Sequence, residues 1–233
     1  MLAHTHALTG AVAWLALAPA LGAATGYELV GGTVLAAGAA LAPDLDHHKG
    51  TAAAVWGPLT RALGRGVAAA CGGHRNGTHT LAAAAIAALL TWWAIEAGGW
   101  WERIVLAFLA GLAFVAWEGL LPGRWERLWS ANLAASAGFG WWAAEQVDFD
   151  GWVGVAVAVG WVAHLAGDVV TDGGAPLLKP LIATRFRLTR LNTGGRWETM
   201  IGWVLTVAVV ALVVAAWTAW PQPWTTWPRP STV

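Results

Sequence analysis

The sequence predicts an all-α fold: a polytopic membrane helical bundle of about seven spans, with a polar site at its cytoplasmic face. Three observations predict it. The 233 residues are 58% hydrophobic and only 11% charged, with a positive mean hydropathy of +0.56, which is too apolar for an ordinary soluble domain. The apolar residues form long runs between polar segments. The basic residues gather in the segments on one side of those runs.

The first run, residues 7–27, follows a short segment that contains His4 and His6. A cleaved signal peptide is the competing interpretation, and it is disfavoured because neither Lys nor Arg precedes the run. The second run, residues 29–42, is shorter than the roughly 20 residues of a usual span. It is rich in Gly and Ala, which allow close helix packing, and it ends at Pro43.

The rest of the chain alternates in the same way. Residues 44–77 form a polar connection with a short surface helix around residues 55–63, and residues 171–198 form a second polar segment. The remaining predicted spans are residues 78–95, 104–121, 128–144, 152–170 and 200–220. The second and fifth of the seven are weak and read equally as partial or re-entrant segments. We therefore expect one membrane-embedded domain, residues 1–220, and a Trp- and Pro-rich tail, residues 221–233.

The charge distribution orients the bundle. With seven spans, every basic residue except Arg103 and Arg229 lies on the side of the amino terminus. The positive-inside rule makes that side cytoplasmic, so we expect a multi-pass membrane protein with a cytoplasmic amino terminus. Several tryptophan pairs then fall at the outer ends of the spans, as an aromatic belt does.

Composition also excludes some partners. The 13 basic residues balance the 13 acidic ones, so the chain lacks the basic surplus of a nucleic-acid-binding domain. Cys71 is the single cysteine, which excludes an internal disulfide and a multi-cysteine metal site. The lipid bilayer is the expected partner, and the oligomeric state is not set by the sequence.

The most informative stretch is residues 41–49, where Asp44, Asp46 and His47 follow an apolar run directly. Ionised groups at the edge of a hydrocarbon layer are costly unless they are paired or coordinated, and a bound cation would compensate them. In an extended backbone, Asp44 and Asp46 point the same way and His47 points the other way. The alternative interpretation is a solvated polar loop, as we assume for His48.

The other histidines also fall in groups at the predicted cytoplasmic side. His74 and His79 bracket a short polar loop, with His79 expected in the first turn of the third span. His164 precedes Asp168 by one helical turn, so both can share a cation. An interfacial role for His6 and a capping role for Asp168 are the alternatives. The candidate metal ligands are His6, Asp44, His47, His74, His79, His164 and Asp168.

Imidazole and carboxylate donors without a thiolate favour zinc, with manganese or iron as alternatives, and the ligands suffice for one or two ions. Asp46 is the candidate general base if it is not a ligand. Arg75 is the candidate residue that stabilises developing negative charge. Together with Thr78, it could also bind a phosphoryl oxygen. Haem is disfavoured because it would leave the carboxylates unexplained.

Four motifs carry a family resemblance: Thr5-His6 with Gly10; Pro43-Asp-Leu-Asp-His47; Gly73-His-Arg-Asn-Gly-Thr-His-Thr80; and His164-Leu-Ala-Gly-Asp168, which continues through Thr171, Gly174 and Pro180 to Arg185-Phe-Arg187. They resemble the bacterial inner-membrane metal-dependent hydrolases described as LexA-regulated or LexA-binding. That family places Gly directly after the His-Arg pair, whereas here Asn76 precedes Gly77. The resemblance implies metal-dependent hydrolysis of an undefined substrate.

The sequence thus predicts a membrane-bound metal-dependent hydrolase. The position of its site at the membrane favours a lipid or a lipid-linked (phospho)ester as substrate. The alternatives are a membrane protein that binds or transports a divalent metal without hydrolysis, and a purely structural role. A transport pathway would need polar residues through the bilayer, and Glu118 is the only charged residue in the third to fifth spans.

Overall fold

The computed structural model describes residues 1–21, 26–118, 128–147, 149 and 151–219. The predicted all-α membrane bundle is confirmed. The predicted tail, residues 221–233, lies outside the described residues. The described helices are α1 (Ala3–Leu17), α2 (Gly26–Ala39), α3 (Pro58–Cys71), α4 (Leu81–Ala97), α5 (Gly99–Glu118), α6 (Trp129–Gln146), α7 (Val153–Val170) and α8 (Arg196–Ala219), with short 3-10 helices η1 (Ala42–Asp46), η2 (Ala52–Ala54) and η3 (Gly77–His79).

The seven predicted spans correspond to α1, α2 and α4 to α8, and the predicted surface helix corresponds to α3. By length and composition, four stretches of the described chain could cross a membrane: Glu28–Asp46, Gly99–Ala116, Val153–Val170 and Arg196–Ala216. Leu81–Ala97 is a shorter apolar helix. At 15 residues, α1 is about 22 Å long, less than the roughly 30 Å of a hydrocarbon core. The count of seven spans therefore stays a prediction.

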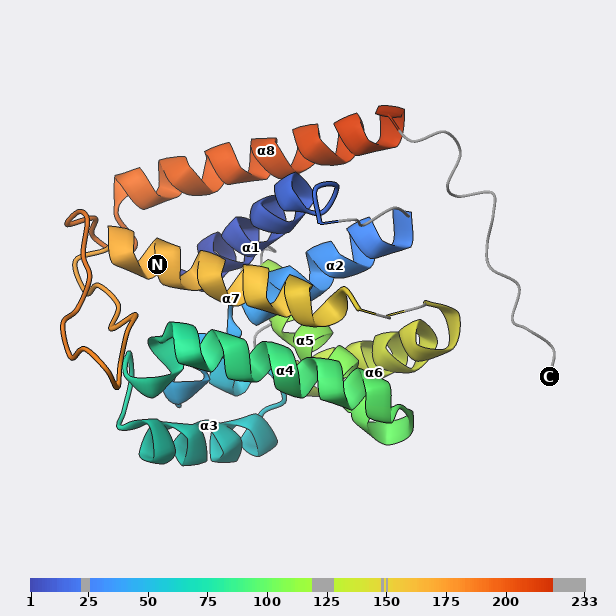
Figure 1. Ribbon diagram of the computed structural model, residues 1–233, viewed down its shortest axis with the longest axis horizontal. Helices are drawn as coiled ribbons and strands as arrows, with labels where there is room; N and C mark the ends of the chain where they lie inside the picture. The colour runs from blue at the N-terminus through green and yellow to red at the C-terminus, as the bar shows by residue number, and fades with distance from the viewer. Residues whose placement is uncertain (22–25, 119–127, 148, 150, 220–233) are drawn as a thin grey trace.

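Helix α2 lies at the centre of the bundle, where it contacts α1, α5 and α7 (Figure 1). Helix α4 packs against α7, α6 packs against α5, and α8 packs against α1. The core between these helices is built from buried apolar side chains such as Trp14, Leu35, Leu106 and Val153. Their burial removes apolar surface from solvent and holds the helices that carry the polar site.

Glycines bring three helices into backbone contact. A Cβ atom on Gly10 of α1 or on Gly160 of α7 would collide with the carbonyl oxygen of Ala36 in α2. Small residues at such crossings allow membrane helices to approach closely. The Ala36 carbonyl thereby fixes the positions of α1, which carries His6, and α7, which carries His164.

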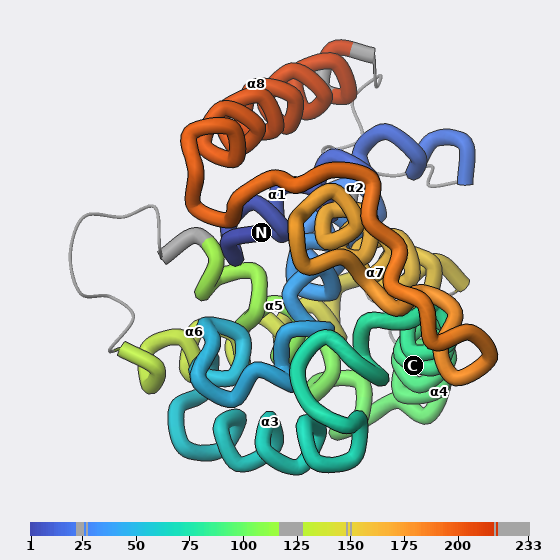
Figure 2. Tube along the Cα trace, turned by 90° about the vertical axis from the view of Figure 1, so that its left-hand side faces the viewer, coloured from blue at the N-terminus to red at the C-terminus, as the bar shows by residue number. Residues whose placement is uncertain are grey.

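The polar segments meet at one end of the bundle, which Figure 2 shows from outside. The amino terminus, the turns of η1 and η2, and the loop before α4 all lie there, and residues 171–195 cross over them. That segment is tied down by backbone hydrogen bonds from Leu81 N to Leu177 O (2.9 Å) and from Leu188 N to Val169 O (2.8 Å). Four motifs that are far apart in sequence are therefore neighbours in space.

Candidate metal centre

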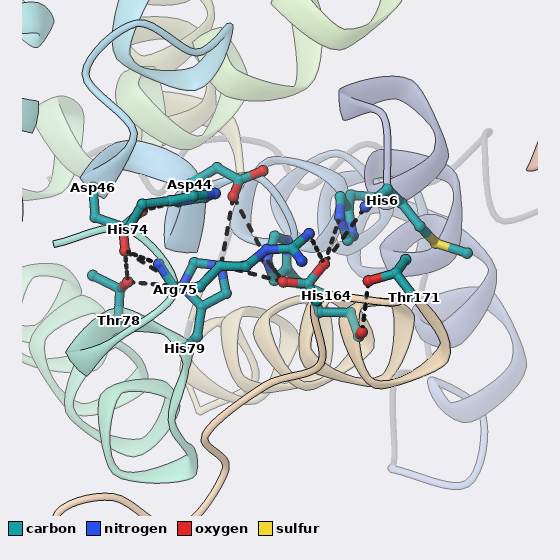
Figure 3. Close-up of polar contacts among 12 residues, drawn as sticks. His6, Asp44, Asp46, His74, Arg75, Thr78, His79, His164 and Thr171 are labelled. Carbon is teal, nitrogen blue, oxygen red and sulfur yellow. Dashed lines mark hydrogen bonds and ion pairs between the residues drawn. The ribbon is translucent and has the colours of Figure 1, made fainter. Parts of the chain in front are cut away.

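Four side chains converge at that end. Figure 3 labels three of them, Asp44 from η1, His79 from η3 and His164 from α7, and the fourth is Asp168, also from α7. We call them the metal quartet. His79 Nε2 lies 3.2 Å from His164 Nε2, 3.5 Å from Asp44 Oδ1 and 3.4 Å from Asp168 Oδ2. His164 Nε2 lies 3.6 Å from Asp168 Oδ2 and 3.9 Å from Asp44 Oδ1.

These distances match tetrahedral coordination. Around an ion with bonds of about 2.0–2.2 Å to nitrogen and oxygen, the ligand atoms of a regular tetrahedron lie about 3.3–3.6 Å apart. Five of the six edges of the quartet measure 3.2–3.9 Å. Along these five edges, the spacing is within a few tenths of an ångström of that expected around a zinc-sized cation.

Buried atoms without hydrogen-bond partners support the same fit. Asp168 Oδ2 and both ring nitrogens of His6 are buried and make no hydrogen bond among the described residues, although other quartet atoms lie 3.4–3.6 Å from Asp168 Oδ2. Leaving such groups unpaired costs free energy that a bound cation would recover. The His6 ring stacks on His164, with centroids 3.9 Å apart, and its Nε2 lies 3.6 Å from Asp168 Oδ1. His6 is thus placed beside the quartet.

The two quartet imidazoles are oriented by contacts of their Nδ1 atoms, while their Nε2 atoms face the quartet. His164 Nδ1 lies 2.7 Å from the carbonyl oxygen of Ala40, so this nitrogen is the N–H donor and Nε2 keeps its lone pair. His79 Nδ1 lies 3.4 Å from Asp46 Oδ2 and 2.9 Å from Thr78 Oγ1. Outer partners of this kind fix the tautomer of metal-binding histidines.

Asp46 is buried and binds the loop before α4 through hydrogen bonds. Its Oδ1 lies 2.8 Å from His74 Nδ1, and its Oδ2 accepts hydrogen bonds from Arg75 N (3.0 Å) and Thr78 Oγ1 (2.5 Å). The backbone at Asp44 and Asp46 is not extended, because both lie in η1, so the condition under which they would point the same way is not met. With three residues per turn, residues two apart point in different directions: Asp44 toward the quartet and Asp46 toward the loop.

The carboxylates of the quartet attract positive charge: Arg75 Nη2 lies 2.8 Å from Asp168 Oδ1, and the amino-terminal ammonium group of Met1 lies 3.5 Å from the same oxygen. Burial alone would lower the pKa of His79, but its hydrogen bonds to Asp44 and Asp46 and the charge of Asp168 outweigh burial and raise the pKa to about 9. The carboxylates therefore favour a positive charge at the position of His79. A divalent cation at the quartet would supply that charge and displace the proton.

Arg75 approaches the quartet from the loop. Its Nη2 donates to Asp168 Oδ1 (2.8 Å), while its buried Nε has no partner in the described part of the chain. Its φ of 56° is in the left-handed region, which non-glycine residues rarely adopt. The backbone N–H of Arg75 donates to Asp46 Oδ2, and its carbonyl oxygen accepts from Arg185 Nη2 (3.0 Å). Such backbone strain, held from both sides, is typical of functional sites.

The remaining candidates lie at the rim. His47 and His74 are both exposed and stack with centroids 4.7 Å apart. Donor atoms of His74, Asp44, Asp46 and His79 lie within 4.8 Å of one another, as do those of His6, His164 and Asp168. These two groups could hold a metal ion. His47 belongs to neither group, and His79 precedes α4 instead of lying in its first turn, because Thr80 is the N-cap.

Three contributions had no signal of their own in the sequence. The carbonyl of Ala40 is a backbone group that any residue would supply. The sequence indicates Thr78 as a donor to a phosphoryl oxygen, but its hydrogen bond to Asp46 has no signal there, because it depends on η1. Trp161 of α7 donates from Nε1 to the carbonyl of Thr78 (3.0 Å) and fixes the loop against α7.

Comparisons with known proteins complete the description. Neither a curated protein nor a solved structure matched the chain. The family model described as YdjM inner membrane protein matches residues 1–224, which include every motif of the metal quartet. This match agrees with the inner-membrane part of the resemblance. The chain therefore belongs to the YdjM inner membrane protein family.

Proposed function

We propose that this protein is a membrane-bound metal-dependent hydrolase that cleaves a lipid or lipid-linked (phospho)ester at the cytoplasmic face of the inner membrane. The observation that carries the proposal is the metal quartet, in which five of the six distances between donor atoms are close to those of a tetrahedral site. Zinc fits best, with manganese and iron as alternatives, and a second ion would use Asp46 and His74.

The residues around the quartet support hydrolysis more than storage. A divalent cation held there would activate water and polarise an ester or phosphoryl oxygen. Arg75 keeps a buried, unpaired Nε beside the quartet, where it can donate to a substrate oxygen as negative charge develops. The hydrogen bonds of Asp46 favour an orienting role over that of a general base.

Transport of the metal, the alternative, is not favoured by the distribution of polar groups. A pathway needs polar side chains through the apolar layer. Among the described residues, the buried titratable side chains are His6, Asp46, His79, His164, Asp168 and Glu198. All belong to the end of the bundle that carries the quartet, since Glu198 accepts hydrogen bonds from Leu2 N and Gly194 N.

The test combines metal analysis with an activity assay on detergent-purified protein. Asp44→Ala, His79→Ala and His164→Ala should each release metal, because the loss of one ligand leaves an incomplete coordination sphere. His48→Ala is the matched control, because His48 is exposed. Hydrolysis of a soluble phosphodiester and of phospholipids should depend on the metal. Stoichiometric metal in all four variants would place the site elsewhere.

Two further parts of the proposal come from the family resemblance and the charge pattern. LexA control of expression would appear as a rise in transcript after DNA damage, and an unchanged transcript would remove it. The cytoplasmic amino terminus rests on the distribution of basic residues.

A further inference from the structure

A cavity lies beside the loop that carries His79, on the side away from the metal quartet. It is a groove of about 600 Å³ whose lining includes Thr78, Ala83, Ala87, Leu90 and Trp161. Its size falls in the range of about 300–1,000 Å³ that is typical of small-molecule sites, which are mostly apolar with a few polar groups. The metal quartet does not line it.

One wall separates the groove from the metal centre. Thr78 lines the groove, while its hydroxyl group contacts Asp46 and His79 on the other side. Trp161, also in the lining, holds the Thr78 carbonyl through its indole N–H. A molecule in the groove would therefore lie directly beside the loop that supplies His79 and Arg75.

The groove is apolar along most of its length. It follows α4 from its N-cap, Thr80, to Leu90, a rise of ten residues or about 15 Å of helix. Ile86 and Leu90, which line it, are 57% and 61% exposed, and α4 carries no charged residue before Glu96. An elongated apolar groove on an apolar helix fits a hydrocarbon chain.

The opposite end of the groove is cationic. Lys179 lies there and donates from Nζ to the side-chain oxygen of Asn76. Within the described part of the chain, no carboxylate lies within 4.0 Å of this ammonium group. A half-buried cation without a counter-ion is a site for an anionic group.

We propose that this groove binds one acyl chain of a membrane phospholipid, with the phosphate group at Lys179 and the chain along α4. The occupant combines the two chemistries that the groove offers, one at each end. This inference rests on the proposed function: the groove holds a phosphate-bearing lipid beside the loop of the metal centre, not at the metal itself, and this lipid class is the substrate that we assign to the centre.

The experiment uses phosphatidic acid with a photoactivatable diazirine in its acyl chain, incorporated into phosphatidylcholine vesicles that contain the full-length protein. Crosslinks mapped by mass spectrometry should fall on residues 83–90. Ala87→Trp, which fills the groove, should lower the crosslinking yield about tenfold. Leu89→Trp, on the same helix but outside the groove, is the matched control and should leave the yield unchanged.

Lys179→Gln tests the polar end and keeps the test decisive if Ala87→Trp does not fold. It should reduce the yield with phosphatidic acid about tenfold, but not the yield with a diacylglycerol probe that lacks the phosphate. An equal loss of crosslinking yield with both probes, or an unchanged yield with both, would overturn the assignment. So would an Ala87→Trp variant that dissociates a dimer without affecting lipid crosslinking, because the groove would then join two copies.

Metal content and hydrolysis of a soluble phosphodiester, measured on the same wild-type preparation, separate the two proposals. Suppose that the protein holds metal and hydrolyses the soluble substrate, but that neither variant changes the lipid crosslinking yield. The groove assignment then fails, whereas the hydrolase proposal stands. If crosslinking follows the variants but the protein binds no metal, the hydrolase proposal fails, and the groove remains a lipid site without a substrate role.

Discussion

Arg75 shows how one side chain can serve chemistry without binding metal. Its guanidinium is permanently protonated and has no acceptor, yet it reaches Asp168 of the metal quartet. Arg75→Lys would keep a positive charge but lose the planar fork of donors. We expect normal metal content and thermal stability, with turnover reduced ~10²-fold, the scale seen when one transition-state donor is removed.

The readouts are metal analysis, thermal unfolding in detergent and initial rates on a soluble phosphodiester. Loss of metal together with activity would mean that Arg75 maintains the quartet through Asp168 and has no separate role in turnover.

Gly173 tests the position of Arg75 without changing Arg75 itself. A Cβ atom at residue 173 would collide with Arg75 Nη1, the far end of a flexible side chain that can move away. Gly173→Ala should therefore barely change the melting temperature but should displace the guanidinium and lower turnover. Gly66→Ala is the control, because nothing lies within 4 Å of a Cβ atom there. Equal rates for the two variants would contradict the predicted role.

The spacing of residues predicted part of this site. Four-residue spacing on a helix was enough to place His164 and Asp168 together, because helical geometry is regular. The directions of Asp44 and Asp46 could not be predicted, because η1 follows from the Pro43 turn and its tertiary contacts, not from an alternating pattern. The orienting contact of His164 with Ala40 joins residues 124 positions apart, and no local signal encodes it.

At the scale of helices, the crossing of α2 and α7 at Gly160 holds the quartet together. A Cβ atom there would press on the Ala36 carbonyl, which is backbone and cannot rotate away. Gly160→Ala should lower stability by about 1–3 kcal/mol, as overpacking usually does, and weaken metal binding by shifting His164. Gly138→Ala on α6, where a Cβ atom meets open space, should do neither. Thermal unfolding and metal titration check both variants. An unchanged melting temperature and metal affinity for Gly160→Ala would show that the helices are not tightly packed at this crossing.

Helix positions were more predictable than helix ends. The apolar runs located α1, α2 and α4 to α8, because burial in lipid and burial in protein both favour apolar residues. The third predicted span begins at residue 78, whereas α4 begins at Leu81, because Thr80 caps the helix by accepting a hydrogen bond from Ala83 N (3.0 Å). The run that became α6 is weak for a span because it contains the buried polar residues Asn132 and Ser136.

At the scale of the whole molecule, the two ends of the bundle differ in chemistry. The metal quartet and the basic loops occupy one end, whereas exposed tryptophans such as Trp92, Trp100 and Trp141 lie near the other ends of their helices. Reporter fusions within residues 48–73 and 185–196 should be cytoplasmic, and a fusion near residue 98 should be external. A cytoplasmic reporter at residue 98 would show that α4 does not cross the membrane and would remove the orientation proposed for the site.

The separation of the quartet along the chain also sets when it can form. His79 and His164 are 85 residues apart, and proteins are synthesised from the amino terminus. Asp44 and His79 therefore leave the ribosome well before their partners on α7, and a metal ion can be captured in full only after α7 has joined the earlier helices. Ribosome-arrested chains that end before residue 153 lack His164 and Asp168 and should bind metal more weakly than chains long enough to insert α7, which makes completion of the quartet a late step of biogenesis.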